Sequence, residues 1–151
     1  PAFNGLGAPH WSPTARGALY GITANTQQSD LARAVLEAAC YQTADILWAA
    51  QSDGSRVHRL RVDGGMSNNN WFLQRLADIL GIAVERPCQI ESTAWGAAYL
   101  AGLTDGLFSS LNEINNISST SDEFTPSITK DERTTLLDGW KIAVERTTAT
   151  L

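Results

Sequence analysis

The longest regular pattern of apolar residues runs from about residue 29 to residue 52. Leu31, Val35 and Ile46 fall on one helical face, and no Gly or Pro interrupts the pattern before Gly54. This spacing predicts a helix over 29–52. The preceding residues are rich in Gly and Pro and predict a loop, with a short extended piece over 17–23.

A second amphipathic pattern lies between two short predicted strands. Residues 58–65 alternate between basic and apolar side chains, and residues 82–87 form another short strand-like run that Pro87 ends. The helix between them is predicted to start at an N-cap of Asn68 or Asn69 and to end at Gly81. Its predicted buried stripe consists of Phe72, Leu73, Leu76, Ile79 and Leu80.

The next apolar segment is unusually rich in small residues. It predicts a helix over 91–102, capped by Ser92 or Thr93, whose Ala and Gly residues would allow close packing against a neighbour. Residues 104–128 are polar and rich in Ser and Asn, so we expect a turn and an irregular surface segment there.

The last pattern begins with a capping box, in which Thr129 and Glu132 can bond each other's backbone N–H groups. A helix is predicted from there to about residue 148, with Trp140 and Val144 on its buried stripe. The order of helices and strands is typical of an α/β fold with parallel pairing. Two short strands are too few for a stable sheet, so further strands from outside this chain are expected.

The composition excludes some classes of function but does not specify one. A chain of 151 residues is long enough for one domain, and 43% of its residues are hydrophobic. The net charge of −5, with eleven scattered Lys and Arg, argues against nucleic acid as a partner. No apolar run approaches the roughly 20 residues of a transmembrane helix.

Cysteines, tryptophans and strand charges all receive structural interpretations. Cys40 and Cys88 lie far apart, form no metal pattern, and are expected to be buried thiols of a cytoplasmic protein. Glu85 and Arg86 are expected on a solvated strand face. The tryptophans at helical spacing are predicted to be core residues: Trp48, Trp71 and Trp140.

The candidate chemistry lies where the first predicted strand ends, at Asp63, Gly64 and Gly65. Without side chains the backbone there can approach a ligand closely, and the following helix start favours phosphate. The adjacent asparagines offer amide groups that suit a base or ribose edge. In an open α/β sheet, ligands bind at this end of the strands.

Alternatives remain open on the residues alone. Two glycines after a strand often make only a turn, and Asp63 is a candidate catalytic base, a Mg²⁺ or water ligand, or a carboxylate that fixes the turn. Neither a G-x-G-x-x-G after a strand nor a GxxxxGK[ST] motif is present. No nucleophile–base pair is recognisable, so no catalytic residue is assigned.

Three stretches together carry a resemblance to a known family. They are "PAFNGLGAPHW" with the "ARGALYGIT" that follows it, "LRVDGGMSNNNWFLQRLADILGIAVERP" and "ESTAWGAAYLAGL". In order and spacing they resemble the C-terminal part of the glycerol kinases, within the FGGY carbohydrate kinases. The first stretch is the one that points to this branch of the family.

The resemblance implies an actin/Hsp70-type, ribonuclease H-like fold and transfer of the ATP γ-phosphate to glycerol with Mg²⁺. It implies that Gly65 and Asn69 contact the adenine nucleotide, that Gly64 and Asp63 shape the turn, and that Met66 lines it. Asn68 stands where the family often has a small residue. Spacing favours Asn69 over Asn68 as the residue that faces the base.

The resemblance also implies that residues 1–151 are a fragment of the nucleotide-binding domain. The glycerol-binding residues, the aspartate base, the phosphate loops and the first strands of the domain would lie before Pro1. This chain alone should then be inactive, and the complete enzyme is expected to be a homo-oligomer. The competing hypotheses are another FGGY kinase, such as a pentulose kinase, and a non-catalytic actin-like module that binds nucleotide.

Overall fold

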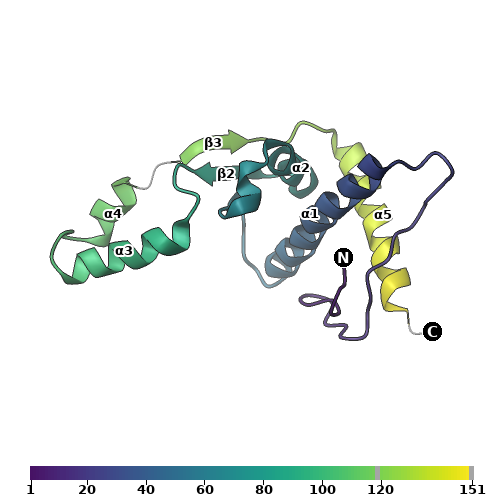
Figure 1. Cartoon of the computed structure of the whole chain (residues 1–151), viewed down its shortest axis with the longest axis horizontal. Helices are drawn as coiled ribbons and strands as arrows, with labels where there is room; N and C mark the ends of the chain where they lie inside the picture. Colours follow the sequence, from purple (N-terminus) through teal and green to yellow (C-terminus); the bar gives the residue numbers. More distant parts are fainter. Residues whose placement is uncertain (118–119, 150–151) are drawn as a thin grey trace.

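The structure is a computed structural model that describes residues 1–117 and 120–149. A loop of 27 residues leads into helix α1. The elements are α1 (Gln28–Ser52), β1 (Arg59–Arg61), the 3-10 helix η1 (Gly65–Asn68), α2 (Asn70–Leu80), β2 (Ala83–Pro87), α3 (Ser92–Thr104), α4 (Leu111–Ile117), β3 (Thr120–Phe124) and α5 (Lys130–Thr148). Figure 1 shows their arrangement.

The three strands form one mixed sheet in the order β1-β2-β3. β1 and β2 pair in parallel, with Leu60 opposite Val84, which confirms the predicted parallel pairing. β3 pairs antiparallel to β2, with Phe124 opposite Val84. The irregular surface segment predicted over 104–128 is therefore wrong, because it contains α4 and β3; its residues 118–119 lie outside the described residues.

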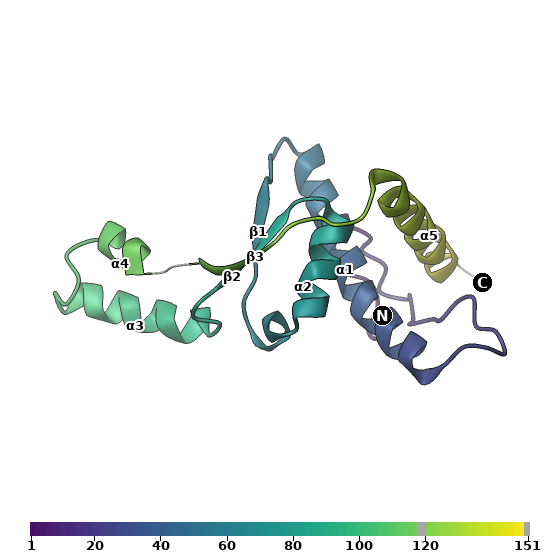
Figure 2. The ribbon, with the colours of Figure 1, turned by 90° about the horizontal axis from the view of Figure 1, so that it is seen from above.

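Helices α1 and α2 cover the same face of the sheet (Figure 2). The predicted α2 stripe is buried there with Val84 and with Cys40 of α1. Asn69 caps α2, and Gly81 ends it in the left-handed conformation with φ +69°, both as predicted. An amphipathic helix with good signals at both ends is the kind of element that sequence predicts best.

The opposite face of the sheet carries charge, and Glu85 is its centre. Its side chain is only 3% exposed and accepts hydrogen bonds from Arg59 and, at 2.9 Å, from Arg61 Nε. The expected solvated face is therefore wrong for Glu85. The register explains the contact, because β1 places both arginines on the same face as the glutamate of β2.

Glu85 should make stability depend on acidic pH. The hydrogen bond from Arg61 lowers the pKa of Glu85 from its ordinary 4.5; burial opposes this and the charge of Arg59 adds to it. Because the folded-state pKa lies below the unfolded-state value, the carboxylate stabilises the fold fully above about pH 4.5 and loses this effect as the pH falls through the lowered pKa.

The measurement is the free energy of urea unfolding of the wild type and of Glu85→Gln across pH. Their difference should be constant near neutral pH and shrink below about pH 4.5. A difference that stayed constant into strong acid would contradict the prediction. Comparing the two proteins removes the effect of Glu113 and Glu132, whose pKa values are also lowered, by hydrogen bonds from Ser109 and Thr129.

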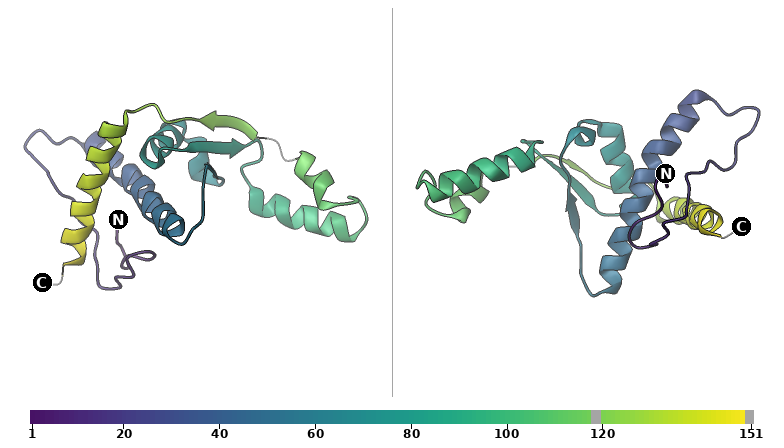
Figure 3. Two further views of the ribbon diagram at one scale, coloured as in Figure 1. Left: turned by 180° about the vertical axis from the view of Figure 1, so that it is seen from behind. Right: turned by 60° about the horizontal axis from the view of Figure 1, so that its bottom comes forward.

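Asp45 of α1 joins three distant segments. One carboxylate oxygen, Oδ2, lies 2.8 Å from His10 Nε2 of the N-terminal loop and accepts a 2.8 Å hydrogen bond from Trp140 Nε1 of α5. Trp140 also stacks on Tyr41, with ring centroids 5.3 Å apart. These contacts explain why the loop and α5 lie beside α1, near the N terminus (Figure 3).

Only one of the three tryptophans predicted as core residues is confirmed. Trp140 packs against the buried residues, whereas Trp48 is 41% exposed and Trp71 is 44% exposed. Cys40 is buried as expected, but Cys88 is exposed, so the prediction of two buried thiols is wrong for Cys88.

Helices α3 and α4 extend away from the sheet and from α1, α2 and α5 (Figures 1 and 3). The N-cap of α3 is Glu91 and not Ser92 or Thr93, and the structure gives it no side-chain capping bond. Gly102 is the one buried residue of α3, and a Cβ there would come within 2.8 Å of Phe108. The close packing expected of its other small residues is not found among the described residues.

Candidate functional site at the start of helix α2

The link from β1 to α2 turns at Gly64. Its φ of +82° and ψ of −179° define a conformation that is essentially confined to glycine. Its N–H donates a 2.8 Å hydrogen bond to the carbonyl of Ile90, which follows β2. The turn is therefore fixed at the carboxyl ends of two parallel strands, where open α/β sheets bind ligands.

Gly65 needs a different explanation from Gly64. Its φ is not positive, and a Cβ added there would meet no atom within 4 Å. Neither the backbone conformation nor packing within the described residues requires glycine at this position. The space beside Gly65 is open, so a ligand can approach the main chain there.

Ser67, which the sequence reasoning missed, is buried beneath the turn and bonds its main chain. It is 1% exposed, and its Oγ and N donate hydrogen bonds of 2.6 and 3.0 Å to the Gly64 carbonyl. Among the described residues no hydrogen bond of the Asp63 side chain is recorded, and that side chain is exposed. Ser67, and not Asp63, fixes the glycine turn.

The three consecutive asparagines do different things. Asn69 Oδ1 accepts a 3.1 Å hydrogen bond from the Phe72 N–H, which identifies it as the N-cap. Asn70 Oδ1 accepts a 2.9 Å hydrogen bond from Arg86 Nη1. Asn68 is exposed, and within the described ranges its side chain has no recorded hydrogen bond. The NH₂ group of Asn69 takes no part in the cap and can donate hydrogen bonds to a ligand.

Arg86 of β2 holds the turn from the sheet side. Besides Asn70, its Nη1 donates to the Ser67 carbonyl at 2.8 Å, and its Nε and Nη2 donate to Asp122 of β3. Its side chain is 16% exposed. The expected solvated position is wrong for Arg86 as well, because the end of β2 meets the start of α2 at this edge of the sheet.

The local electrostatics favour an anionic ligand. The first turn of α2 has no acidic residue to offset the partial positive charge of its N–H groups. Met66, the residue between the two glycines and Ser67, is 49% exposed. The described residues contain no group of three or more His, Cys, Asp or Glu that could hold a metal ion.

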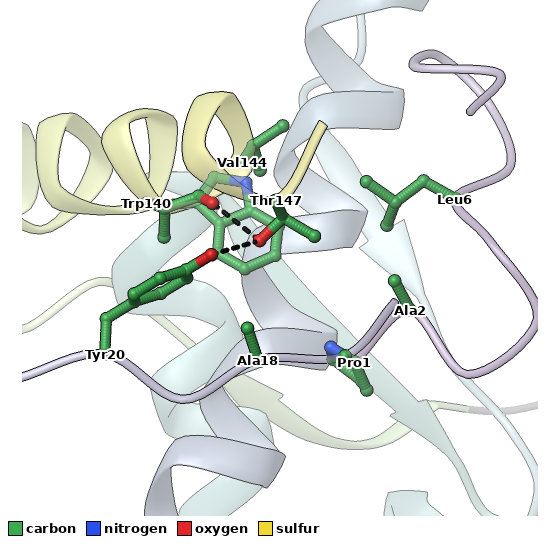
Figure 4. Close-up of a pocket in the computed structure, with 10 residues that line it drawn as sticks. Pro1, Ala2, Leu6, Ala18, Tyr20, Trp140, Val144 and Thr147 are labelled. Atoms are coloured by element: carbon green, nitrogen blue, oxygen red, sulfur yellow. Dashed lines mark hydrogen bonds between the residues drawn. The ribbon is translucent and has the colours of Figure 1, made fainter. Parts of the chain in front are cut away.

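A separate hollow lies between the N-terminal loop and α5 (Figure 4). Tyr20 closes one side, where its hydroxyl lies 3.1 Å from Thr147 Oγ1. No Arg, Lys or His lines it, and none of its lining residues belongs to β1, η1 or α2. It therefore suits a phosphorylated ligand less well than the start of α2 does.

Residues 1–104 match the C-terminal domain of the FGGY family of carbohydrate kinases. The chain belongs to this family. None of the described helices of this FGGY chain has the length and apolar character that a membrane span requires.

The relatives of this FGGY chain include glycerol kinases. That of Coxiella burnetii is 53% identical over 147 residues, which cover 97% of this chain and 29% of the relative. That of Alteromonas mediterranea is 51% identical over 146 residues, which cover 97% of this chain and 30% of the relative. The chain therefore spans 29–30% of the length of the curated relatives named here.

Solved structures give the same family. The crystal structure of Plasmodium falciparum glycerol kinase with ADP matches with a TM-score of 0.88 and 38% identity, over 100% of this chain and 30% of that one. A ligand-bound xylulose kinase from Lactobacillus acidophilus matches with a TM-score of 0.75 and 23% identity, over 98% and 31% of the two chains, which shows a shared fold. The fold is thus that of the ribonuclease H-like C-terminal domain of FGGY kinases, as predicted.

Proposed function

We propose that residues 1–151 form the C-terminal portion of the nucleotide-binding domain of a glycerol kinase. The complete enzyme would transfer the γ-phosphate of ATP to glycerol and produce sn-glycerol 3-phosphate. The high identity to glycerol kinases over nearly the whole chain supports this substrate, whereas the xylulose kinase similarity concerns only the fold. No observation favours a non-catalytic module over a kinase.

This portion would bind the adenine-nucleotide side of ATP or ADP. The observation that carries the proposal is the open space beside Gly65, next to the start of α2. Gly64 would shape the turn with Ser67 bonded to its carbonyl, Met66 would line it, and the Asn69 NH₂ group would donate to an acceptor of the nucleotide. The Plasmodium relative, whose structure was solved with ADP, supports the ligand class.

The remaining parts of the reaction would come from outside residues 1–151. Phosphoryl transfer relies on positioning and charge stabilisation, and the described residues offer neither a metal group nor a nucleophile–base pair. Further strands would extend the sheet beyond β1, and α3, with Leu100 62% exposed and Trp95 40% exposed, would pack against that added part. Glycerol and Mg²⁺ would bind there, in a cytoplasmic enzyme that forms homo-oligomers.

The test is the activity of the complete polypeptide that contains residues 1–151. ADP formation from ATP should depend on glycerol and should be slower with xylulose or gluconate at equal concentration. The isolated chain should show no activity with any of them. Faster turnover of xylulose than of glycerol would overturn the substrate assignment. Turnover by residues 1–151 alone would overturn the proposal that the reaction needs residues outside this chain.

A further inference from the structure

Arg86 connects the glycine turn, the start of α2 and strand β3. Its Nη1 donates to Ser67 in η1 and to Asn70 in α2, while its Nε and Nη2 face Asp122 of β3. The guanidinium carbon also lies 5.6 Å from the centre of the Phe124 ring. With 16% of its side chain exposed, Arg86 is held between these elements.

The two residues that Arg86 contacts at the turn, Ser67 and Asn70, are each linked to a proposed nucleotide contact. Ser67 bonds the Gly64 carbonyl through its own Oγ at 2.6 Å, and Gly64 precedes Gly65. Asn70 directly follows Asn69, the N-cap of α2. A shift of the guanidinium would therefore move both the glycine turn and the capping asparagine.

We propose that Arg86 is a positioning residue for nucleotide binding: it holds the 64–70 turn in the shape that admits ATP. This inference rests on the proposed function. Arg86 itself need not touch the nucleotide, and its charge is already paired with Asp122. Its effect is geometric, and it fixes the main chain at Gly65 and the amide of Asn69 relative to the sheet.

The geometry of the guanidinium explains why arginine is required. Its planar fork bonds the turn through one nitrogen while two others engage the Asp122 carboxylate. The ammonium of lysine is a single centre on a flexible stem and cannot hold both sides in one fixed geometry. Arg86→Lys thus keeps the positive charge but loses the connection.

The experiment is steady-state kinetics of the complete kinase with Arg86→Lys, together with ADP binding by calorimetry. The KM for ATP and the Kd for ADP should rise about tenfold, while kcat and the KM for glycerol change less than about twofold. Asn70→Ala, which removes one of the two contacts at the turn and leaves all charges in place, should raise the KM for ATP about threefold.

Asp122→Asn is the matched control, because it removes the charge of the ion pair with Arg86, while its amide oxygen can still accept hydrogen bonds from the guanidinium and both contacts at the turn remain. It should lower the melting temperature as Arg86→Lys does, with little effect on the KM for ATP. Equal KM increases in Arg86→Lys and Asp122→Asn, or a loss of thermal stability alone in Arg86→Lys, would overturn the positioning role.

Gly65→Val distinguishes failure of this inference from failure of the proposed function. If Gly65→Val leaves the KM for ATP unchanged, the proposed nucleotide site fails. If it raises that KM and Arg86→Lys does not, only the inference about Arg86 fails.

Discussion

Gly65→Val in the complete kinase should lower kcat/KM for ATP about 100-fold and leave the KM for glycerol unchanged. A branched side chain there would occupy the space into which the nucleotide is proposed to fit. A ligand displaced by about 1 Å from its productive position can lose roughly two orders of magnitude in rate. The measurement is initial rate against ATP concentration at saturating glycerol, with ADP affinity from calorimetry.

The fold should tolerate this substitution. The Gly65 backbone is not left-handed, and a Cβ there meets nothing within 4 Å. A change of less than about 1 kcal/mol in the free energy of unfolding is expected, as for other exposed positions. If Gly65→Val loses ATP use but keeps its stability, then Gly65 belongs to a ligand site and is not needed only for the turn.

Two other glycines serve as controls. Gly64→Ala should lower the free energy of unfolding by about 1–3 kcal/mol, because residue 64 has a φ of +82° that a side chain disfavours. Gly139→Ala should leave ATP use unchanged, since Gly139 lies in α5 and a Cβ added there would have no neighbouring segment within 4 Å. An unchanged KM for ATP in Gly65→Val would refute the placement of the nucleotide.

Sequence predicted the parts of the fold that depend on local chemistry. The apolar spacing of α2, the Asn69 cap and the Gly81 terminus each follow from residues within one or two helical turns. The capping box of Thr129 and Glu132 is present for the same reason. The glycine turn was also identified from sequence, because a strand, two glycines and a helix start are contiguous.

The wrong predictions concern contacts between distant segments. Strand β3 consists mostly of polar residues and, among the described strands, pairs only with β2, so no apolar run marks it in the sequence. Glu85 and Arg86 each look like solvated strand residues until the register brings Arg59, Arg61 and Asp122 beside them. Pairing partners 24 to 36 residues away leave no periodic signal.

Ser67 and Arg86 were missed in the candidate site for a related reason. Ser67 is an ordinary residue in a polar cluster, and only its burial beneath Gly64 gives it a role. A usable signal existed for Arg86: it lies at the carboxyl end of a strand predicted to pair in parallel with the strand before the glycines. Side chains at the ends of such neighbours meet at one edge of the sheet.

Asn69→Asp should raise the KM for ATP about 30-fold without weakening the helix. Aspartate caps a helix as well as asparagine does, and a carboxylate suits the positive helix start, so α2 should keep its stability. The substitution removes the NH₂ donor, which takes no part in the cap and is the proposed ligand contact of Asn69, and it adds a negative charge beside an anionic nucleotide. Together these effects amount to about 2 kcal/mol of lost binding.

Asn68→Asp is the control that separates charge from hydrogen bonding, because it adds the same charge one residue earlier and leaves the Asn69 donor in place. It should raise the KM for ATP less than fivefold, roughly the effect of a partly screened surface charge. Thermal unfolding of both variants would show that the cap survives. If Asn68→Asp raised the KM for ATP more than Asn69→Asp does, the base would face Asn68, and Asn69 would serve only as the N-cap of α2.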